Sequence, residues 1–95
     1  MRTAEFHIKL SDETWTIRFV TMKELGGKKW GDCDRDSKLI RVYRGLKSFD
    51  QMDTIIHEIR HAQAPHETEE HINRTSTEIA AALGLAGFTR PEKKP

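Results

Sequence analysis

Two histidines four residues apart, with a glutamate directly after the first, form the clearest chemical pattern in this sequence. The segment His57-Glu58-Ile59-Arg60-His61 has the form H-E-x-x-H. Residues four apart on a helix leave the same face, so both imidazoles can reach one zinc ion at about 2.0–2.1 Å. Glu58 lies beside that face, where its carboxylate can take a proton from a water molecule on the ion. The pattern predicts one Zn²⁺ ion, with His57 and His61 as ligands and Glu58 as the catalytic base.

A first helix is expected to carry this pattern. Ser48 followed by Gln51 predicts a capping box at its start, and Pro65 predicts its end. Apolar residues recur at helical spacing along this segment and predict one buried face. They are Phe49, Met52, Ile55, Ile56, Ile59 and Ala62.

A second helix is expected to follow after a short reversal of the chain. Thr68 has the side chain of an N-cap, and acidic residues occupy the next two positions. Gly84 and Gly87 are typical signals for the end of a helix. The predicted apolar stripe consists of Ile72, Ile79, Leu83 and Ala86.

The first half of the chain predicts two hairpins. Apolar and polar residues alternate over 5–11 and 14–19, which favours two half-buried strands joined by a tight turn. Residues 22–29 contain Gly26-Gly27 and predict a loop. The segments Trp30–Asp34 and Leu39–Arg44 are expected to form the second hairpin. Strands followed by helices predict a single α+β domain, in which a small antiparallel sheet packs on the H-E-x-x-H helix and a second, C-terminal ligand helix.

The composition limits the size and class of this domain. The chain has 95 residues, of which 36% are hydrophobic and 33% charged, so the apolar core is expected to be thin. We expect one domain over residues 1–89 and a frayed, charged tail over 90–95. The net charge of +1 disfavours a nucleic-acid-binding protein, which usually has a strongly basic domain.

Two further features bear on the compartment. Cys33 is the single cysteine, which excludes an internal disulfide and is typical of the reducing cytoplasm. No run approaches the ~20 apolar residues of a membrane span, and residues 1–5 lack the apolar segment of a signal peptide. The sequence therefore predicts a cytoplasmic protein without membrane association.

Between Trp30 and Phe88 the chain resembles the zincin metallopeptidases, and most closely the short phage- and prophage-encoded proteins similar in scale to minigluzincins. The resemblance rests on the Trp-Gly-x-Cys-Asp segment, the strand Leu39–Val42, the helix Thr54–His61 and the Glu-rich start of the next helix. It implies a small sheet on an active-site helix, a second helix that supplies a glutamate, and zinc-dependent hydrolysis of peptide bonds. Thr54 matches the extended zincin pattern, whereas Arg60 replaces an uncharged residue of that pattern.

The third zinc ligand is expected near the start of the second helix, where a gluzincin takes a glutamate. The metzincin alternative requires glycine and histidine three and six residues after His61, where this chain has Ala64 and Glu67. We choose Glu70, since four-residue spacing places it on one helix face with Arg74 and Glu78. The alternatives that stay open are Glu69, Glu67, His66 and His71.

Several other residues are candidates for supporting roles. Arg74 could orient the Glu70 carboxylate or contact substrate, and Glu78 could support the site from one turn further on. His71 and Tyr43 could stabilise the oxyanion that forms during attack on a peptide bond. The resemblance also implies that an extended peptide binds along an edge strand. That strand would comprise Trp30, Gly31, Asp32, Cys33 and Asp34.

The sequence thus predicts a zinc-dependent metallopeptidase that acts on a peptide or protein substrate. A chain of this length can form only shallow substrate-binding subsites. We therefore expect low substrate specificity, or specificity that depends on a homodimer or a protein partner. The alternative from another class is a non-catalytic, zinc-stabilised binding or regulatory module of phage type. Either protein would work in the cytoplasm, which is the host cytoplasm if a phage encodes the chain.

Overall fold

Four strands precede two helices in the part of the chain that the computed structural model describes, residues 5–88. The elements are β1 (Glu5–Leu10), β2 (Glu13–Val20), β3 (Gly31–Asp34), β4 (Leu39–Tyr43), α1 (Ser48–Gln63) and α2 (Glu69–Leu85). This is the α+β order that the sequence predicts. The expected tail at 90–95 and the last residue of the expected domain lie outside the described residues.

The strands form one four-stranded sheet in the order β1-β2-β4-β3. Both predicted hairpins are present, because β1 pairs antiparallel with β2 and β3 pairs antiparallel with β4. The expectation of a purely antiparallel sheet is wrong, since β2 and β4 are parallel. After β2 the chain crosses to the edge of the sheet, where it forms β3. It then turns back and forms β4 between β3 and β2, and β4 runs in the same direction as β2. This order leaves β3 as an edge strand.

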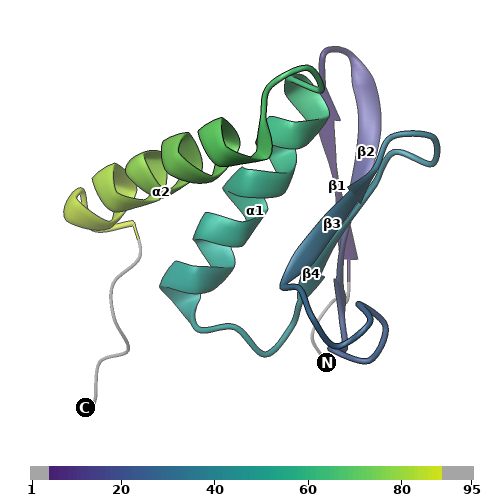
Figure 1. The fold of residues 1–95 in the computed structure, drawn as a ribbon, viewed down its shortest axis with the longest axis horizontal. Helices are drawn as coiled ribbons and strands as arrows, with labels where there is room; N and C mark the ends of the chain where they lie inside the picture. Colours follow the sequence, from purple (N-terminus) through teal and green to yellow (C-terminus); the bar gives the residue numbers. More distant parts are fainter. Residues whose placement is uncertain (1–4, 89–95) are drawn as a thin grey trace.

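One face of the sheet carries the apolar core. Trp15 and Ile17 from β2 and Ile40 and Val42 from β4 are almost completely buried, and they pack with Ala62 of α1. Figure 1 shows the sheet, α1 and α2 as successive layers, with α1 in the middle. Because α1 has neighbours on two sides, most of its side chains are half-buried, and only Thr54, Glu58 and Ala62 are fully buried.

The start of α1 differs from the prediction. Lys47 is the N-cap residue, Ser48 is already helical, and no side chain caps the helix. The expected capping box is therefore absent, and the backbone amide of Gln51 donates to the Lys47 carbonyl at 2.7 Å. The end is close to the prediction, because the helix stops at Gln63, two residues before Pro65.

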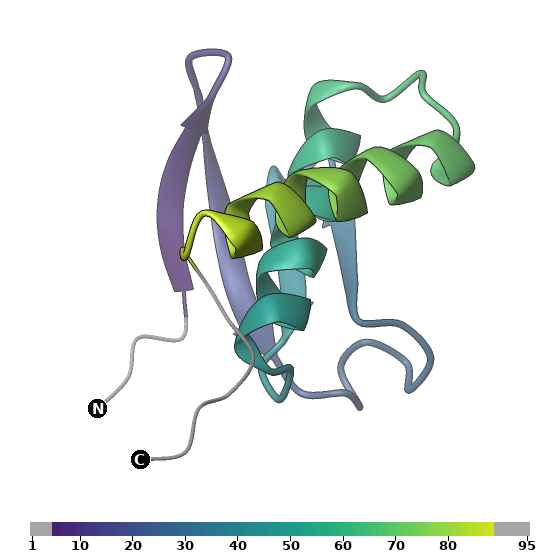
Figure 2. The same cartoon turned by 90° about the vertical axis from the view of Figure 1, so that its left-hand side faces the viewer.

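Helix α2 crosses over α1, as Figure 2 shows, and buries a different stripe from the predicted one. Ile72, Ser76 and Ala80 are its buried residues, whereas Ile79 is 41% exposed and Ala86 lies beyond the helix end. Small residues at two of the three buried positions permit a close approach of the helices. Gly84 lies inside α2, and only Gly87, with φ of 93°, follows its end.

The opposite face of the sheet is mostly polar, although Val20 of β2 is buried there. Arg18 of β2 donates to Glu5 of β1 at 2.7 Å, and Arg41 of β4 forms two hydrogen bonds with Asp32 of β3. This distribution explains the alternating sequence pattern of the strands. Within residues 5–88, neither helix is long and apolar enough to cross a membrane.

Candidate metal centre

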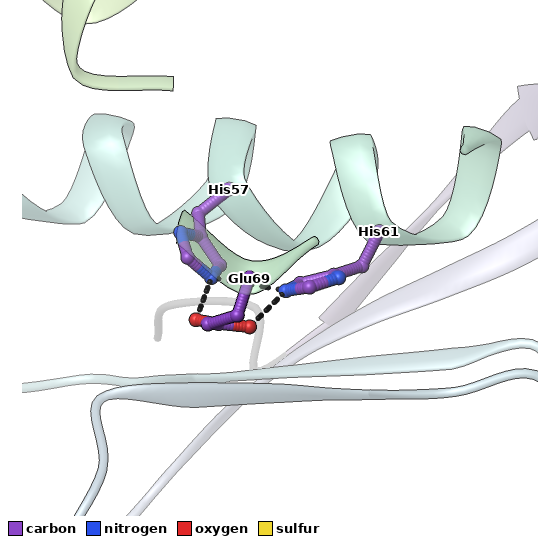
Figure 3. Close-up of side chains that lie close together, drawn as sticks. All are labelled: His57, His61 and Glu69. Carbon is purple, nitrogen blue, oxygen red and sulfur yellow. Dashed lines mark hydrogen bonds and ion pairs between the residues drawn. The ribbon is translucent and has the colours of Figure 1, made fainter. Parts of the chain in front are cut away.

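Successive turns of α1 present the imidazole rings of His57 and His61 side by side (Figure 3). Their Nε2 atoms lie 3.2 Å apart, and the ring planes are inclined by 66°. This is the convergence that a four-residue spacing on a helix predicts. Both side chains are largely shielded, with exposed fractions of 15% and 26%.

The carboxylate of Glu69 lies against both rings. Its Oε2 is 3.0 Å from Nε2 of His57, and its Oε1 is 2.8 Å from Nε2 of His61. Glu69 is the first residue of α2, directly after Thr68, whose hydroxyl accepts a hydrogen bond from the backbone amide of His71 at 3.1 Å. The Thr68 cap is therefore confirmed, and the chain reversal before it brings the first turn of α2 beside the two histidines.

Glu69 takes the place for which Glu70 was predicted, and that choice is corrected. Glu70 is exposed and does not belong to the cluster. Residues advance by about 100° around a helix, so Glu69 points about 60° from the buried Ile72 and Glu70 about 160° from it. Glu69 therefore faces α1, whereas Glu70 faces away from it. The other open alternatives, His66, Glu67 and His71, also lie outside the cluster.

The donor atoms of His57, His61 and Glu69 suit a metal ion. All lie within 4.8 Å of one another. The shorter separations of 2.8–3.2 Å are close to the roughly 3.3 Å between neighbouring ligands of a tetrahedral zinc ion with bonds of about 2.0–2.1 Å. Two imidazoles and one carboxylate are a common donor set for zinc. Within residues 5–88 no fourth ligand-type side chain joins the group, so the arrangement could hold an ion with an open position.

A groove of about 740 Å³ runs past these three side chains, between α1, β3 and the start of α2. Of the predicted edge-strand residues, Trp30, Gly31, Asp32 and Cys33 line the groove, and Asp34 does not. Trp30 precedes the strand and is 50% exposed at the rim. The groove therefore brings the edge of the sheet and the histidine–glutamate cluster together.

Glu58 lies in the wall of this groove and is only 6% exposed. Burial raises the pKa of its carboxyl group to about 7, and the nearby negative charges of Asp32 and Glu69 act in the same direction. A carboxylate with a pKa near neutrality is well matched to accepting and releasing a proton. The residue predicted as the base thus has a position and an environment suited to that role.

The close approach of β3 to α1 depends on Gly31. A Cβ atom at this position would lie 2.8 Å from the Arg41 carbonyl oxygen and 2.9 Å from Cγ2 of Thr54, and also close to Glu58. A larger residue would push the strand away from the helix. Glycine therefore allows the edge strand to pack directly against the turn of α1 that carries the glutamate.

Two neighbours of Gly31 on β3 have defined electrostatic environments. Asp32 accepts hydrogen bonds from Arg41 and has Nζ of Lys29 at 3.3 Å, and the Arg41 bond most strongly lowers the pKa of its carboxyl group. Cys33 is half-buried, and burial raises the pKa of its thiol to about 11. Cys33 is therefore a packed thiol with little thiolate at neutral pH.

Arg60, the unusual charged residue inside the motif, does not line the groove. Its Nη2 atom donates to Oε1 of Glu67 at 2.6 Å and to the hydroxyl of Thr75 at 3.3 Å. His71 belongs to the same group of side chains, since its Nε2 lies 3.7 Å from Oε1 of Glu67. Arg74 contacts Nδ1 of His71 at 3.1 Å. The predicted supporting residues His71 and Arg74 therefore contact each other and do not line the groove.

The two remaining candidates also lie away from the cluster. Tyr43 follows Val42 in β4, and neighbouring strand residues point to opposite faces, so Tyr43 is on the face away from α1. Glu78 is exposed on α2 and does not line the groove. The structure thus brings neither residue to the histidines, contrary to the predicted oxyanion and supporting roles.

The groove also contains residues that sequence reasoning missed. Asp53 lies one turn before His57 on α1, accepts a weak hydrogen bond from Thr77 at 3.4 Å and has its pKa raised by burial. Its four-residue spacing from His57 was a usable signal. The others are Lys28, Lys29, Arg35, Pro65 and Asn73. Nothing in their local sequence marks them, because they reach the groove through the tertiary fold.

No protein-family model, curated protein sequence or solved structure matches this chain. The interpretation of the site therefore depends on its own residues and geometry.

Proposed function

We propose that this protein is a zinc-dependent metallopeptidase of the minimal zincin type. The observation that carries the proposal is the convergence of His57, His61 and Glu69 beside the buried Glu58, in a groove bordered by an edge strand. Zinc is the ion we favour, because two imidazoles, one carboxylate and an open position are typical of catalytic zinc sites. A zinc ion in this position supplies a Lewis acid that polarises a carbonyl group and makes a water molecule more acidic.

The residues of the chain divide the remaining work. His57 and His61 hold fixed positions on one helix, and Glu69 closes the site from the second helix. Glu58 takes the proton from the attacking water at its carboxylate and passes it to the leaving amine. The burial that raises its pKa also keeps bulk water from this carboxylate.

The substrate in this proposal is an extended peptide. β3 is the end strand of the sheet and forms one wall of the groove, so its outer edge can accept a further strand through main-chain hydrogen bonds. Such bonds carry little information about side chains. Among the described residues that line the groove, Trp30 has the one large exposed apolar ring that could contact a substrate side chain.

A non-catalytic module is the second candidate, and one observation favours it. The cluster joins α1 to α2, so an ion there would stabilise the packing of the two helices without any reaction. The two functions share the metal site and differ in whether Glu58 is needed. Glu58 is therefore the residue that separates them.

The test is a peptidase assay on the zinc-loaded protein with an unfolded protein substrate such as labelled casein. The wild type should cleave it, Glu58→Gln should bind zinc normally and lose cleavage by about 10²-fold or more, and His57→Ala should lose both. Glu58→Gln removes the proton acceptor and leaves the metal ligands in place, whereas His57→Ala removes a metal ligand. A wild type that binds zinc without cleaving any peptide would favour the module instead.

A further inference from the structure

A charged side chain inside the motif bridges three segments of the chain. Arg60 does not line the groove, and its Nη2 atom reaches Glu67 at 2.6 Å and Thr75 at 3.3 Å. Glu67 belongs to the connection between the helices, and Thr75 lies in the second turn of α2. The side chains of Arg60 and Glu67 are 22% and 36% exposed, so this charge-assisted contact is partly shielded from solvent.

The partners of Arg60 are themselves fixed. The backbone amide of Glu67 donates to the Ala64 carbonyl at 3.1 Å, and the hydroxyl of Thr75 donates to the carbonyl of His71 at 2.9 Å. Nε2 of His71 lies 3.7 Å from Oε1 of Glu67, the same oxygen atom that accepts from Arg60. Arg60 therefore holds both the end of the connection and the first turns of α2 against α1.

Apart from its contacts with His57 and His61, the Glu69 side chain makes no ion pair or side-chain hydrogen bond among the described residues. Glu69 lies two residues after Glu67, at the first position of α2, and its side chain is 72% exposed. An exposed side chain on a helix end has an entropic cost of ordering when its carboxylate binds a ligand. Metal ligands need positions accurate to a few tenths of an ångström.

We propose that Arg60 is a positioning residue for the metal ligand Glu69, acting through its ion pair with Glu67. The clamp of Arg60, Glu67 and Thr75 fixes the backbone directly before Glu69, so that the carboxylate meets His57 and His61 before any ion arrives. This inference rests on the proposed metal site. The positioning role would explain why this chain has Arg60 where the extended zincin pattern has an uncharged residue.

The experiment measures the zinc affinity of the purified, metal-free protein by competition with a chromophoric chelator. Arg60→Gln and Glu67→Gln should each weaken zinc binding by about 10- to 100-fold, the range seen when residues that orient metal ligands are removed. The matched control is Arg18→Gln, which breaks an ion pair of 2.7 Å with Glu5 on the opposite face of the sheet. It should leave the affinity within about twofold of the wild type.

A double-mutant cycle separates positioning from a general loss of structure. In a Glu69→Gln background, in which zinc has only the two histidines, Arg60→Gln should change the affinity less than about twofold. A full loss in that background would overturn the proposal, because Arg60 would then act on the fold and not through Glu69. Circular dichroism of the metal-free variants checks their folding, and Glu67→Gln replaces Arg60→Gln if the latter unfolds.

The outcomes for the clamp and for the proposed function are distinct. Normal zinc binding by the wild type and by both clamp variants overturns the positioning role and leaves the metal site intact. A wild type that binds no zinc overturns the metal site itself, and the clamp with it.

Discussion

Cys33 and Glu58 lie in the narrow space between β3 and α1, and both show how burial sets chemistry at single residues. Burial raises the pKa of the Cys33 thiol to about 11 and that of the Glu58 carboxyl group to about 7. For the thiol this removes the reactive thiolate at neutral pH, whereas for the carboxyl group it produces a proton acceptor suited to neutral pH. The same environment thus makes the Cys33 thiol unreactive and gives the Glu58 carboxyl group a pKa suited to catalysis at neutral pH.

The thiol of Cys33 should therefore react slowly with iodoacetamide. At pH 7.5 its thiolate population is lower than that of an ordinary cysteine by about a hundredfold or more, and its half-burial restricts access further. A thiolate of higher pKa is more nucleophilic, so mass spectrometry of the native protein should show alkylation about tenfold slower or more than in 8 M urea. Equal rates in the two conditions would contradict the assigned environment.

The ion pair of Asp32 with Arg41 makes a pH-dependent contribution to stability. The bond lowers the pKa of Asp32 below its ordinary 3.8, so its contribution is fully present above about pH 4 and is lost as the pH falls through the lowered value. Asp32→Asn should reduce the free energy of unfolding by about 1 kcal/mol at pH 7. Urea unfolding should show the difference between wild type and variant shrinking below pH 4, and a constant difference down to pH 2 would contradict the role of the charge.

At the scale of the elements, the separation between β3 and α1 is set by Gly31. The backbone of the strand and Thr54 of the helix leave no room for a Cβ atom there. This packing places the edge strand beside Glu58 and gives the groove its width. A change at Gly31 should therefore affect both stability and the groove.

Gly31→Ala should lower the free energy of unfolding by about 1–3 kcal/mol, the usual cost of overpacking. Thr54→Ser removes the Cγ2 atom that lies 2.9 Å from the added methyl group, so the double variant should recover part of the loss. Urea unfolding of the four proteins measures this coupling. Additive effects of the two substitutions would mean that the strand and the helix are not in the contact described.

The elements also show where sequence reasoning succeeds. Alternation predicted the first hairpin, and the second hairpin, the motif helix and the Thr68 cap were also predicted from local patterns. The parallel pairing of β2 with β4 was missed, because no local pattern specifies which strands become neighbours across a long loop. The Ser48 cap was wrong, since the backbone starts the helix without help from a side chain.

The third ligand was missed for a geometric reason that the sequence did contain. Glu70 was chosen because it shares one face of α2 with Arg74 and Glu78. That helix face is opposite to the one that carries Ile72, which packs on α1. Glu69 lies three residues before Ile72 and seven before Ser76, both completely buried. The helix face that packs was therefore the better guide than a line of charged residues.

At the scale of the whole molecule, the candidate metal site lies at the interface of the two helices, to which α2 brings few buried side chains. α1 lies between the sheet and α2, and α2 contributes only Ile72, Ser76 and Ala80 to the buried interior (Figure 1). The hydroxyl of Ser76 has no hydrogen-bond partner among the described residues, which further weakens this interface. An ion held from both helices would add its binding free energy to the stability of the fold.

Removal of the metal should therefore lower the melting temperature. Zinc at a hundredfold excess over its dissociation constant stabilises a folded protein by about 2.7 kcal/mol, or roughly 10–20 °C for a domain of this size. Thermal unfolding with and without EDTA measures the shift, and His57→Ala should show none. An unchanged melting curve of the wild type would mean that no ion joins the two helices.

The most direct test of the account is the zinc content of the purified protein and of two variants that differ by one position. The wild type and Glu70→Gln should each hold one equivalent of zinc at neutral pH after dialysis, as measured by atomic emission spectrometry. Glu69→Gln should lose most of it, because it removes the carboxylate that contacts both histidines. A wild type without stoichiometric zinc, or a loss confined to Glu70→Gln, would contradict the site built from His57, His61 and Glu69.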